Sequence, residues 1–290
     1  MTVRDESELR RRGDRLVYVG AVLINLALFA LAIFLIEHGS AWLDQYPRLA
    51  KRAQDVRALA LALLAAPPVL VFMRHRRRAN AAGNGIRVSP TQLPELYDTL
   101  VRFCGRLGHH EIPALYIAEQ AKGVSEAFAA WREEFIVIRP VFFIAPLEEV
   151  RPIYEFEIGR ELGRIRLGHT RWWEELLVAY VVKLPLVRNP LLHARTYAYD
   201  RYAAYLAPDS IRGLTVHASG RPLYKLIDIP SFVAQAETTR GFWPWLSNLT
   251  RSEPHVTFRL RALIDAGLFP REAAAAHPQS VTPAPRRASA

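Results

Sequence analysis

Residues 160–164 combine side chains that could do chemistry at a spacing that fits one face of a helix. Their sequence is Arg-Glu-Leu-Gly-Arg, which places Arg160 and Arg164 on adjacent turns with Glu161 between them. A glutamate in such a place could act as a general base or as one half of an ion pair. A guanidinium is permanently charged and has no lone pair to donate, so neither arginine can bind a metal ion.

The same residues also fit an ordinary amphipathic helix. Glu157 lies three positions before Arg160, and Glu161 stands in the same relation to Arg164. Opposite charges at this spacing stabilise a helix by roughly 0.2–0.5 kcal/mol. Without a metal ion nearby, we favour an ion-paired carboxylate over a working base as the role of Glu161. We interpret His169, just beyond the helix, as a structural hydrogen-bonding histidine.

The elements that must position these residues follow from the apolar pattern. Helical spacing and short apolar runs predict helices over residues 94–107, 148–167, 194–206 and 255–266, with strands over 114–117 and 134–138. In the second helix, an apolar stripe of Ile158, Leu162 and Ile165 leaves the arginines on a different face. Residues 80–89, which include two glycines, predict a linker. The fold class is therefore α+β, mostly helical with a small sheet.

Two apolar runs precede this domain. In residues 16–36 the only clearly polar side chain is Asn25, and the run would span roughly 31 Å as a helix, close to a bilayer core. Residues 58–73 form a shorter uncharged run that contains a prolyl pair at 67–68, which predicts a kink or a shortened helix. The two runs together predict a two-helix transmembrane hairpin.

Basic residues flank the outer ends of this hairpin and indicate its orientation. The chain has a net charge of +10, and its arginine-rich flanks are Arg10, Arg11, Arg12 and Arg15 before the first run and residues 74–78 after the second. The positive-inside rule then predicts a multi-pass protein of the plasma membrane with both termini and the main domain cytoplasmic. Topology explains the arginines without nucleic acid as a partner, and no nucleic-acid-binding motif is present. The single cysteine, Cys104, excludes an internal disulfide and fits a reducing compartment.

The chain accordingly divides into three parts. Residues 1–78 form a membrane anchor, residues 79–270 form the main domain, and residues 271–290 are predicted to be disordered because they are rich in Ala, Pro and Ser. Residues 172–192 are apolar but interrupted by charges and a proline. They predict a bent helix, either on the membrane surface or in the core.

Several short motifs occur in an order that points to a known family. They are Leu96-Tyr97, Pro113-Ala114-Leu115-Tyr116-Ile117, Glu126-Ala127-Phe128-Ala129, Gly168-His169, and Glu253-Pro254-His255 with Arg259 and Leu263. This order resembles the HtpX-like and CAAX-prenyl-protease-like membrane zinc metallopeptidases, which are gluzincins, over most of residues 15–268. The family's central motif is His-Glu-x-x-His, in which two histidines hold Zn²⁺ and the glutamate is the general base.

The resemblance implies a zincin-like domain whose zinc ligands are replaced. Both histidine positions carry arginine, Arg160 and Arg164, and an alignment on Tyr197 and Asp200 puts Thr196 at the third ligand position. Glu161 keeps the general-base position as a vestige, and Asp200 and His169 keep positions that support the ligands in the family. We therefore expect no bound metal and no cofactor.

The function that the resemblance implies is a pseudo-protease that binds membrane-protein or peptide clients or regulates an active relative. In zincins an edge strand beside the active helix pairs with an extended substrate. Its counterpart here comprises Ser125, Glu126, Ala127, Phe128 and Ala129, and extends to residue 130. One alternative is an active membrane zinc metalloendopeptidase that recruits other ligands, such as His169 with Glu157 or Glu161. Another is a membrane scaffold without a cleft.

Two guanidinium groups on adjacent turns need compensation if the domain buries them, because an unpaired buried charge costs several kcal/mol. Asp200 occupies the position that would orient the first metal-binding histidine, so it should face Arg160. We therefore predict an Arg160–Asp200 ion pair, with Arg164 held by Glu161 or Glu157.

Overall fold

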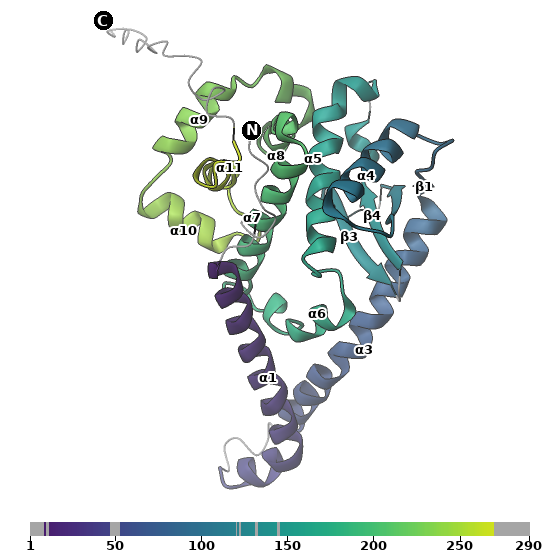
Figure 1. Ribbon diagram of the computed structural model, residues 1–290. Coiled ribbons are helices and arrows are strands. Elements are labelled where there is room, and N and C mark those ends of the chain that lie inside the picture. The colour runs from purple at the N-terminus through teal and green to yellow at the C-terminus, as the bar shows by residue number, and fades with distance from the viewer. Residues whose placement is uncertain are drawn as a thin grey trace, which may run out of the picture.

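The computed structural model describes residues 9, 12–46, 53–119, 121, 123–130, 133–143 and 146–269. Its helices are α1 (Arg12–Asp44), α3 (Ala53–Asn84), α4 (Pro94–Leu107), α5 (Leu147–Arg166), α6 (Trp172–Leu177), α7 (Arg188–Leu206), α8 (Arg212–Leu223), α9 (Ile229–Thr238), α10 (Phe242–Thr250) and α11 (Val256–Asp265). Its strands are β1 (Ile86–Arg87), β2 (Ala114–Ile117), β3 (Ser125–Ala130) and β4 (Glu133–Ile138), and its short 3₁₀ turns are η2 (Pro140–Phe142), η3 (Val181–Lys183), η4 (Pro208–Ser210) and η5 (Tyr224–Leu226). The predicted fold, mostly helical with a small sheet, is confirmed (Figure 1).

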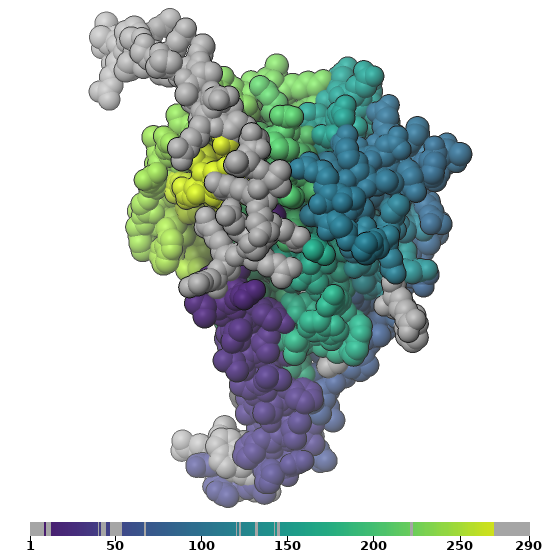
Figure 2. Space-filling view, in the orientation of Figure 1, coloured from purple at the N-terminus to yellow at the C-terminus, as the bar shows by residue number. Residues whose placement is uncertain are grey.

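Helices α1 and α3 form a hairpin that projects as a narrow stalk from a wider body (Figures 1 and 2). Within α1, Gly13–Gly39 is long and apolar enough to cross a membrane. Helix α3 bends by 44° between Gln54–Ala66 and Pro68–Asn84, and its two halves reach that criterion only when they are taken together. The bend falls at the prolyl pair, where backbone N–H donors are missing. The predicted basic flank at Arg10 and Arg11 lies outside the described residues.

The predicted linker at 80–89 is wrong, because α3 runs without interruption to Asn84 and β1 follows at once. Ala81 is buried against the sheet, and the N–H of Gly85 donates to the Ala81 carbonyl at 2.9 Å. Tertiary packing therefore outweighs the cost of a glycine within the helix. The boundary expected after residue 78 falls inside a helix that the stalk and the body share.

The sheet has the strand order β1-β2-β4-β3, with β2 parallel to β4 and β3 antiparallel to β4. The end of α3 packs on one face through Ala81, while Ile136 and Ile138 of β4 face α4 and α5 on the other. The two predicted strands and the predicted edge segment are present, and β3 lies at the sheet's edge beside α5.

Close packing of α5 on α7 places the charged residues of both helices together. A Cβ atom added at Gly163 would lie 2.5 Å from Tyr202 Cβ, and one at Gly159 would lie 2.9 Å from Ala203 Cα. Only glycine fits at these two crossing points. The glycine of the 160–164 segment thus has a packing role.

The C-terminal part adds helices that the apolar pattern did not predict, namely α8, α9 and α10, before α11 at the predicted 255–266. Residues 172–192 form α6, η3 and the start of α7, a bent segment that packs against α1 through Val178 and Val181. The tail 271–290 lies outside the described residues.

Candidate functional site: a buried charge cluster

The predicted ion pair between α5 and α7 is present. Arg160 Nε lies 3.0 Å from Asp200 Oδ1, and Arg160 Nη1 lies 3.1 Å from Glu157 Oε2. Arg160 is 9% exposed and the two carboxylates are 1% exposed, so these charges are held away from water. A pair in such surroundings needs further partners to offset its desolvation.

Arg259 of α11 supplies one of these partners and binds Asp200 from a different helix. Its Nε donates to Asp200 Oδ2 and its Nη2 donates to Asp200 Oδ1, both at 2.7 Å. This two-pronged contact is the strong geometry for an arginine and a carboxylate. Asp200 therefore joins α5, α7 and α11 at one point. The sequence motifs singled out Arg259 but did not suggest this contact.

His217 of α8 is a second partner that sequence reasoning missed. Its Nε2 lies 2.8 Å from Glu157 Oε1 and 3.4 Å from Arg160 Nη1. No local pattern could have indicated it, because 57 positions separate His217 from Arg160. Glu157 is thus engaged by a guanidinium on one oxygen and an imidazole on the other.

Glu161 and Arg164 continue the cluster toward α7. Arg164 Nη1 lies 3.2 Å from Glu161 Oε2, and the Arg164 guanidinium lies over the Tyr199 ring, 4.8 Å from its centroid. The Ser125 hydroxyl of β3 lies within hydrogen-bond distance of two carboxylates, 2.6 Å from Glu157 and 2.7 Å from Glu161. The cluster therefore touches the edge strand as well as the helices.

These contacts set the protonation states of the cluster. Burial alone would raise the pKa of Glu157, but Arg160 and His217 hold it below its ordinary value. Burial would also raise the pKa of Asp200, but Arg259 and Arg160 hold it below its ordinary value. Burial, followed by Arg259, lowers the pKa of His217 despite the opposing effect of Glu157. At neutral pH the favoured forms are therefore the neutral imidazole of His217 and the ionised carboxylates of Glu157 and Asp200.

The third expected ligand position and His169 do not complete a metal site. Thr196 is buried on α7, one helical turn before Asp200, and offers only a neutral hydroxyl. His169 Nδ1 lies 3.0 Å from the Tyr199 hydroxyl. Among the described residues, no group of three or more His, Cys, Asp and Glu side chains is arranged to hold a metal ion. The donor set of this site does not fit zinc.

The outer edge of β3, the last strand of the sheet, is not fully paired with the backbone of the described residues. The Arg139 N–H donates to the Val124 carbonyl, so the backbone groups of Val124 point toward β4. Backbone groups alternate in direction along an antiparallel strand, and those of Ser125, Ala127 and Ala129 therefore point away from β4. Those of Ala129 are taken: its N–H donates to the Thr170 carbonyl, and its carbonyl accepts from the Arg74 side chain. Within the described part of the chain, the outward backbone groups of Ser125 and Ala127 have no partner.

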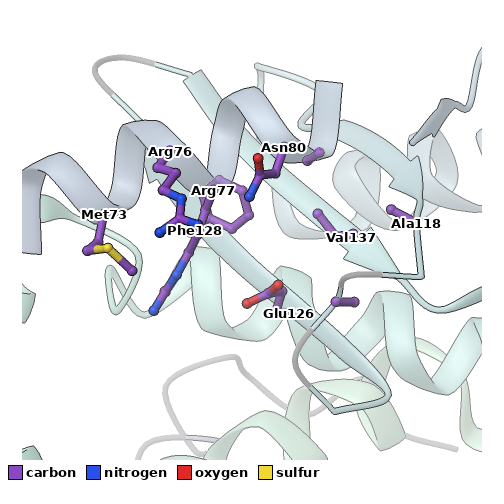
Figure 3. A pocket seen from close by; sticks show the side chains of 10 residues that line it. Met73, Arg76, Arg77, Asn80, Ala118, Glu126, Phe128 and Val137 are labelled. Atoms are coloured by element: carbon purple, nitrogen blue, oxygen red, sulfur yellow. The ribbon is translucent and has the colours of Figure 1, made fainter. Parts of the chain in front are cut away.

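A pocket of about 210 Å³ adjoins this edge on the face covered by α3. Glu126 and Phe128 line it from β3, and Arg76 and Arg77 line it from α3 (Figure 3). The Arg77 Nε is buried and has no hydrogen-bond partner among the described residues. Alternate residues of β3 thus face this pocket and the charge cluster.

A second hollow reaches the cluster from the C-terminal side. It is a groove of about 650 Å³ that His217 and Arg259 line together with residues of α9, α10 and α11. Trp243, which is 75% exposed, also lines this groove. The charge cluster is therefore buried but lies directly beneath a surface groove.

Comparisons of the chain with protein families, with curated proteins and with solved structures found no match.

Proposed function

We propose that this protein is a membrane-anchored, zincin-like pseudo-protease that binds extended segments of membrane proteins or regulates an active relative. Its main domain would sit in the cytoplasm beneath a two-helix anchor. The observation that carries the proposal is the unpaired stretch of the β3 edge at Ser125 and Ala127, beside the helix that bears Arg160, Glu161 and Arg164. An extended peptide can add to such an edge through backbone hydrogen bonds alone.

The charge cluster supports the loss of metal-dependent hydrolysis. Three guanidinium groups face three carboxylates in it: Arg160, Arg164 and Arg259 against Glu157, Glu161 and Asp200. Each of these carboxylates therefore lies within ion-pair distance of a cation that would compete with a metal ion for it. Arginine charge thus occupies the region where a zinc protease would hold its metal, and it serves to tie helices together.

The hairpin supports the membrane part of the proposal. Along α1, large apolar side chains such as Leu23, Leu26 and Phe34 are exposed. Along α3, Leu59, Leu61 and Phe72 are exposed in the same way. Exposed apolar side chains along both legs suit lipid. The basic flanks support a cytoplasmic position of both termini, so a reporter fused after residue 78 should be cytoplasmic.

Peptide binding can be tested with the full-length protein in detergent and fluorescent ten-residue peptides from unfolded casein. If the peptide adds to β3, methylation of its backbone nitrogens should weaken binding at least tenfold at alternate positions and little between them. Ala127→Pro, which removes an outward N–H at a strand edge that tolerates proline, should weaken binding similarly. Ala127→Ser retains the N–H and is the matched control.

The methylation scan gives different results for an edge-strand site and for its absence. A two-residue periodicity in the methylation scan supports pairing with an edge strand and requires no change to the protein. No binding by the unaltered protein, or equal losses at every methylated position, contradicts the proposed peptide site. The Ala127→Pro result is interpreted only if the variant unfolds at a temperature close to that of Ala127→Ser.

A further inference from the structure

Residues 172–187 comprise α6 and the turns that lead to α7. This segment lies between the two legs of the hairpin (Figure 1). It is held there by Asn25, the polar residue in the middle of the first apolar run. Asn25 Nδ2 donates to the Leu176 carbonyl at 3.1 Å, and the Tyr180 N–H donates to Asn25 Oδ1 at 2.8 Å. Asn25 is 5% exposed, so both hydrogen bonds are buried.

These contacts lie well inside the two apolar runs of the hairpin. Asn25 lies nine positions after Leu16, which is roughly 14 Å along a helix and close to half of a bilayer core. The Tyr180 hydroxyl donates at 2.9 Å to the carbonyl of Leu63, which lies well inside the second apolar run. The segment therefore reaches the level at which both legs would be surrounded by acyl chains.

The charged residues of the segment lie near its two ends, as a position between acyl chains requires. Glu174 and Glu175 come first and are paired near the cytoplasmic ends of the legs. Glu174 lies 2.7 Å from Arg195 and accepts a hydrogen bond from Tyr18, while Glu175 lies 2.8 Å from Arg74. The next seven residues, 176–182, carry no charge. Lys183 follows, exposed, on a side chain long enough to extend toward the headgroups.

The backbone of the segment is largely satisfied from within. The N–H groups of Ala179, Val182, Lys183, Leu184 and Arg188 donate to carbonyls of the same segment, and that of Tyr180 donates to Asn25. Backbone polar groups at membrane depth must be satisfied within the protein, because acyl chains offer no hydrogen bonds. The outward side chains are apolar: Trp172, Trp173, Leu184, Leu186 and Val187 are 37–56% exposed.

We propose that residues 172–187 form a re-entrant element that enters the cytoplasmic leaflet and returns, with lipid acyl chains as the occupant of its exposed apolar face. This inference rests on the proposal that the hairpin spans the membrane, because the segment packs against both α1 and α3 of that hairpin. It differs from both positions that the sequence left open for this segment, the membrane surface and the domain core, and places the segment within the leaflet beside the hairpin.

Single cysteines added to the full-length protein in lipid vesicles can test this, with a water-soluble maleimide supplied to both sides. Cys104 is buried and stays in every variant, so the unaltered protein provides the background. Trp173→Cys and Leu186→Cys probe the segment. Leu26→Cys in α1 is the lipid control, and Asp98→Cys on the exposed side of α4 is the water control.

We expect Trp173→Cys, Leu186→Cys and Leu26→Cys to react at least tenfold more slowly than Asp98→Cys, and all four to react fully in SDS. Fast reaction of Trp173→Cys and Leu186→Cys with slow reaction of Leu26→Cys overturns the re-entrant element alone. Fast reaction of Leu26→Cys overturns the membrane hairpin. A measurement without cysteines is quenching of tryptophan fluorescence by brominated acyl chains, which should decrease in the double variant Trp172→Phe/Trp173→Phe.

Discussion

Arg160 and Arg259 bind the same buried carboxylate from two different helices, with Arg160 Nε 3.0 Å and Arg259 Nε 2.7 Å from the oxygens of Asp200. One carboxylate thus neutralises part of two guanidinium charges at the centre of the helical body. This relationship makes Asp200 the residue on which the packing of α5, α7 and α11 depends.

Removal of the Asp200 side chain should therefore strongly destabilise the protein. Asp200→Ala leaves two buried guanidinium groups short of a partner, and we expect the free energy of unfolding in detergent to fall by about 3 kcal/mol or more. Lys225→Ala is the matched control, since its ion pair with Glu149 joins side chains that are 48% and 50% exposed. An Asp200→Ala effect no larger than that of the control would show that the cluster contributes little to stability.

Acid should weaken the domain in two stages. The lowered pKa of His217 means that the unfolded chain binds its proton first, so stability falls as the pH drops below the ordinary value of 6.5. The lowered pKa values of Glu157 and Asp200 add a second loss below their ordinary values of 4.5 and 3.8. Denaturant unfolding at several pH values measures both stages.

The contribution of the imidazole can be separated by substitution. His217→Gln keeps a hydrogen-bond donor beside Glu157 but cannot titrate, so it should lose less stability than the unaltered protein between about pH 6.5 and 5. Below that range the two proteins should lose stability in parallel, since the carboxylates remain. Identical pH profiles across the whole range would exclude His217 as the source of the first stage.

Gly163 should resist substitution for a steric reason. The Cβ of Gly163→Ala would lie 2.5 Å from Tyr202 Cβ, so α5 and α7 must separate, at a cost of about 1–3 kcal/mol in the free energy of unfolding. Gly105→Ala in α4 is the control, because a Cβ there meets nothing within 4 Å. That change should stabilise the protein by roughly 0.5–1 kcal/mol. Equal effects of the two changes would contradict the close crossing.

Restoring ligands tests whether the supporting residues of a zinc site remain. Arg160→His, Arg164→His and Thr196→Glu together should bring zinc binding toward one ion per chain, measured by metal analysis after purification in detergent. The same triple change combined with Asp200→Ala should bind zinc more weakly, by about 10–100-fold. A folded triple variant without zinc would indicate that the likeness to a zinc site stops at the sequence.

The sequence predicted those elements whose start and end depend on local residues. The helix at 94–107 begins at a proline and ends at Gly108, and the edge strand 125–130 has the expected bounds. The predicted linker at 80–89 is wrong because Ala81 packs on the sheet and α3 stays helical as far as Asn84. Helix α8 lacks a clear apolar period, whereas α9 and α10 have one comparable to that of α11 and were nevertheless not predicted.

The charge cluster shows the same division. The pairs within α5 follow from spacing along one helix, and the Arg160–Asp200 pair follows from an alignment of motifs. Ser125, His217 and Arg259 could not be placed in the cluster from sequence, because they come from three other elements. Nothing local marks a serine or a histidine as a partner of a carboxylate far away in the chain.

The zinc content of the full-length, detergent-purified protein tests the central claim most directly, when it is measured together with cleavage of unfolded casein. Arginine at both histidine positions and carboxylates committed to ion pairs predict well under one zinc per chain and no cleavage. Stoichiometric zinc with chelator-sensitive cleavage that is lost in Glu161→Gln would contradict the pseudo-protease account and favour an active metalloendopeptidase with other ligands.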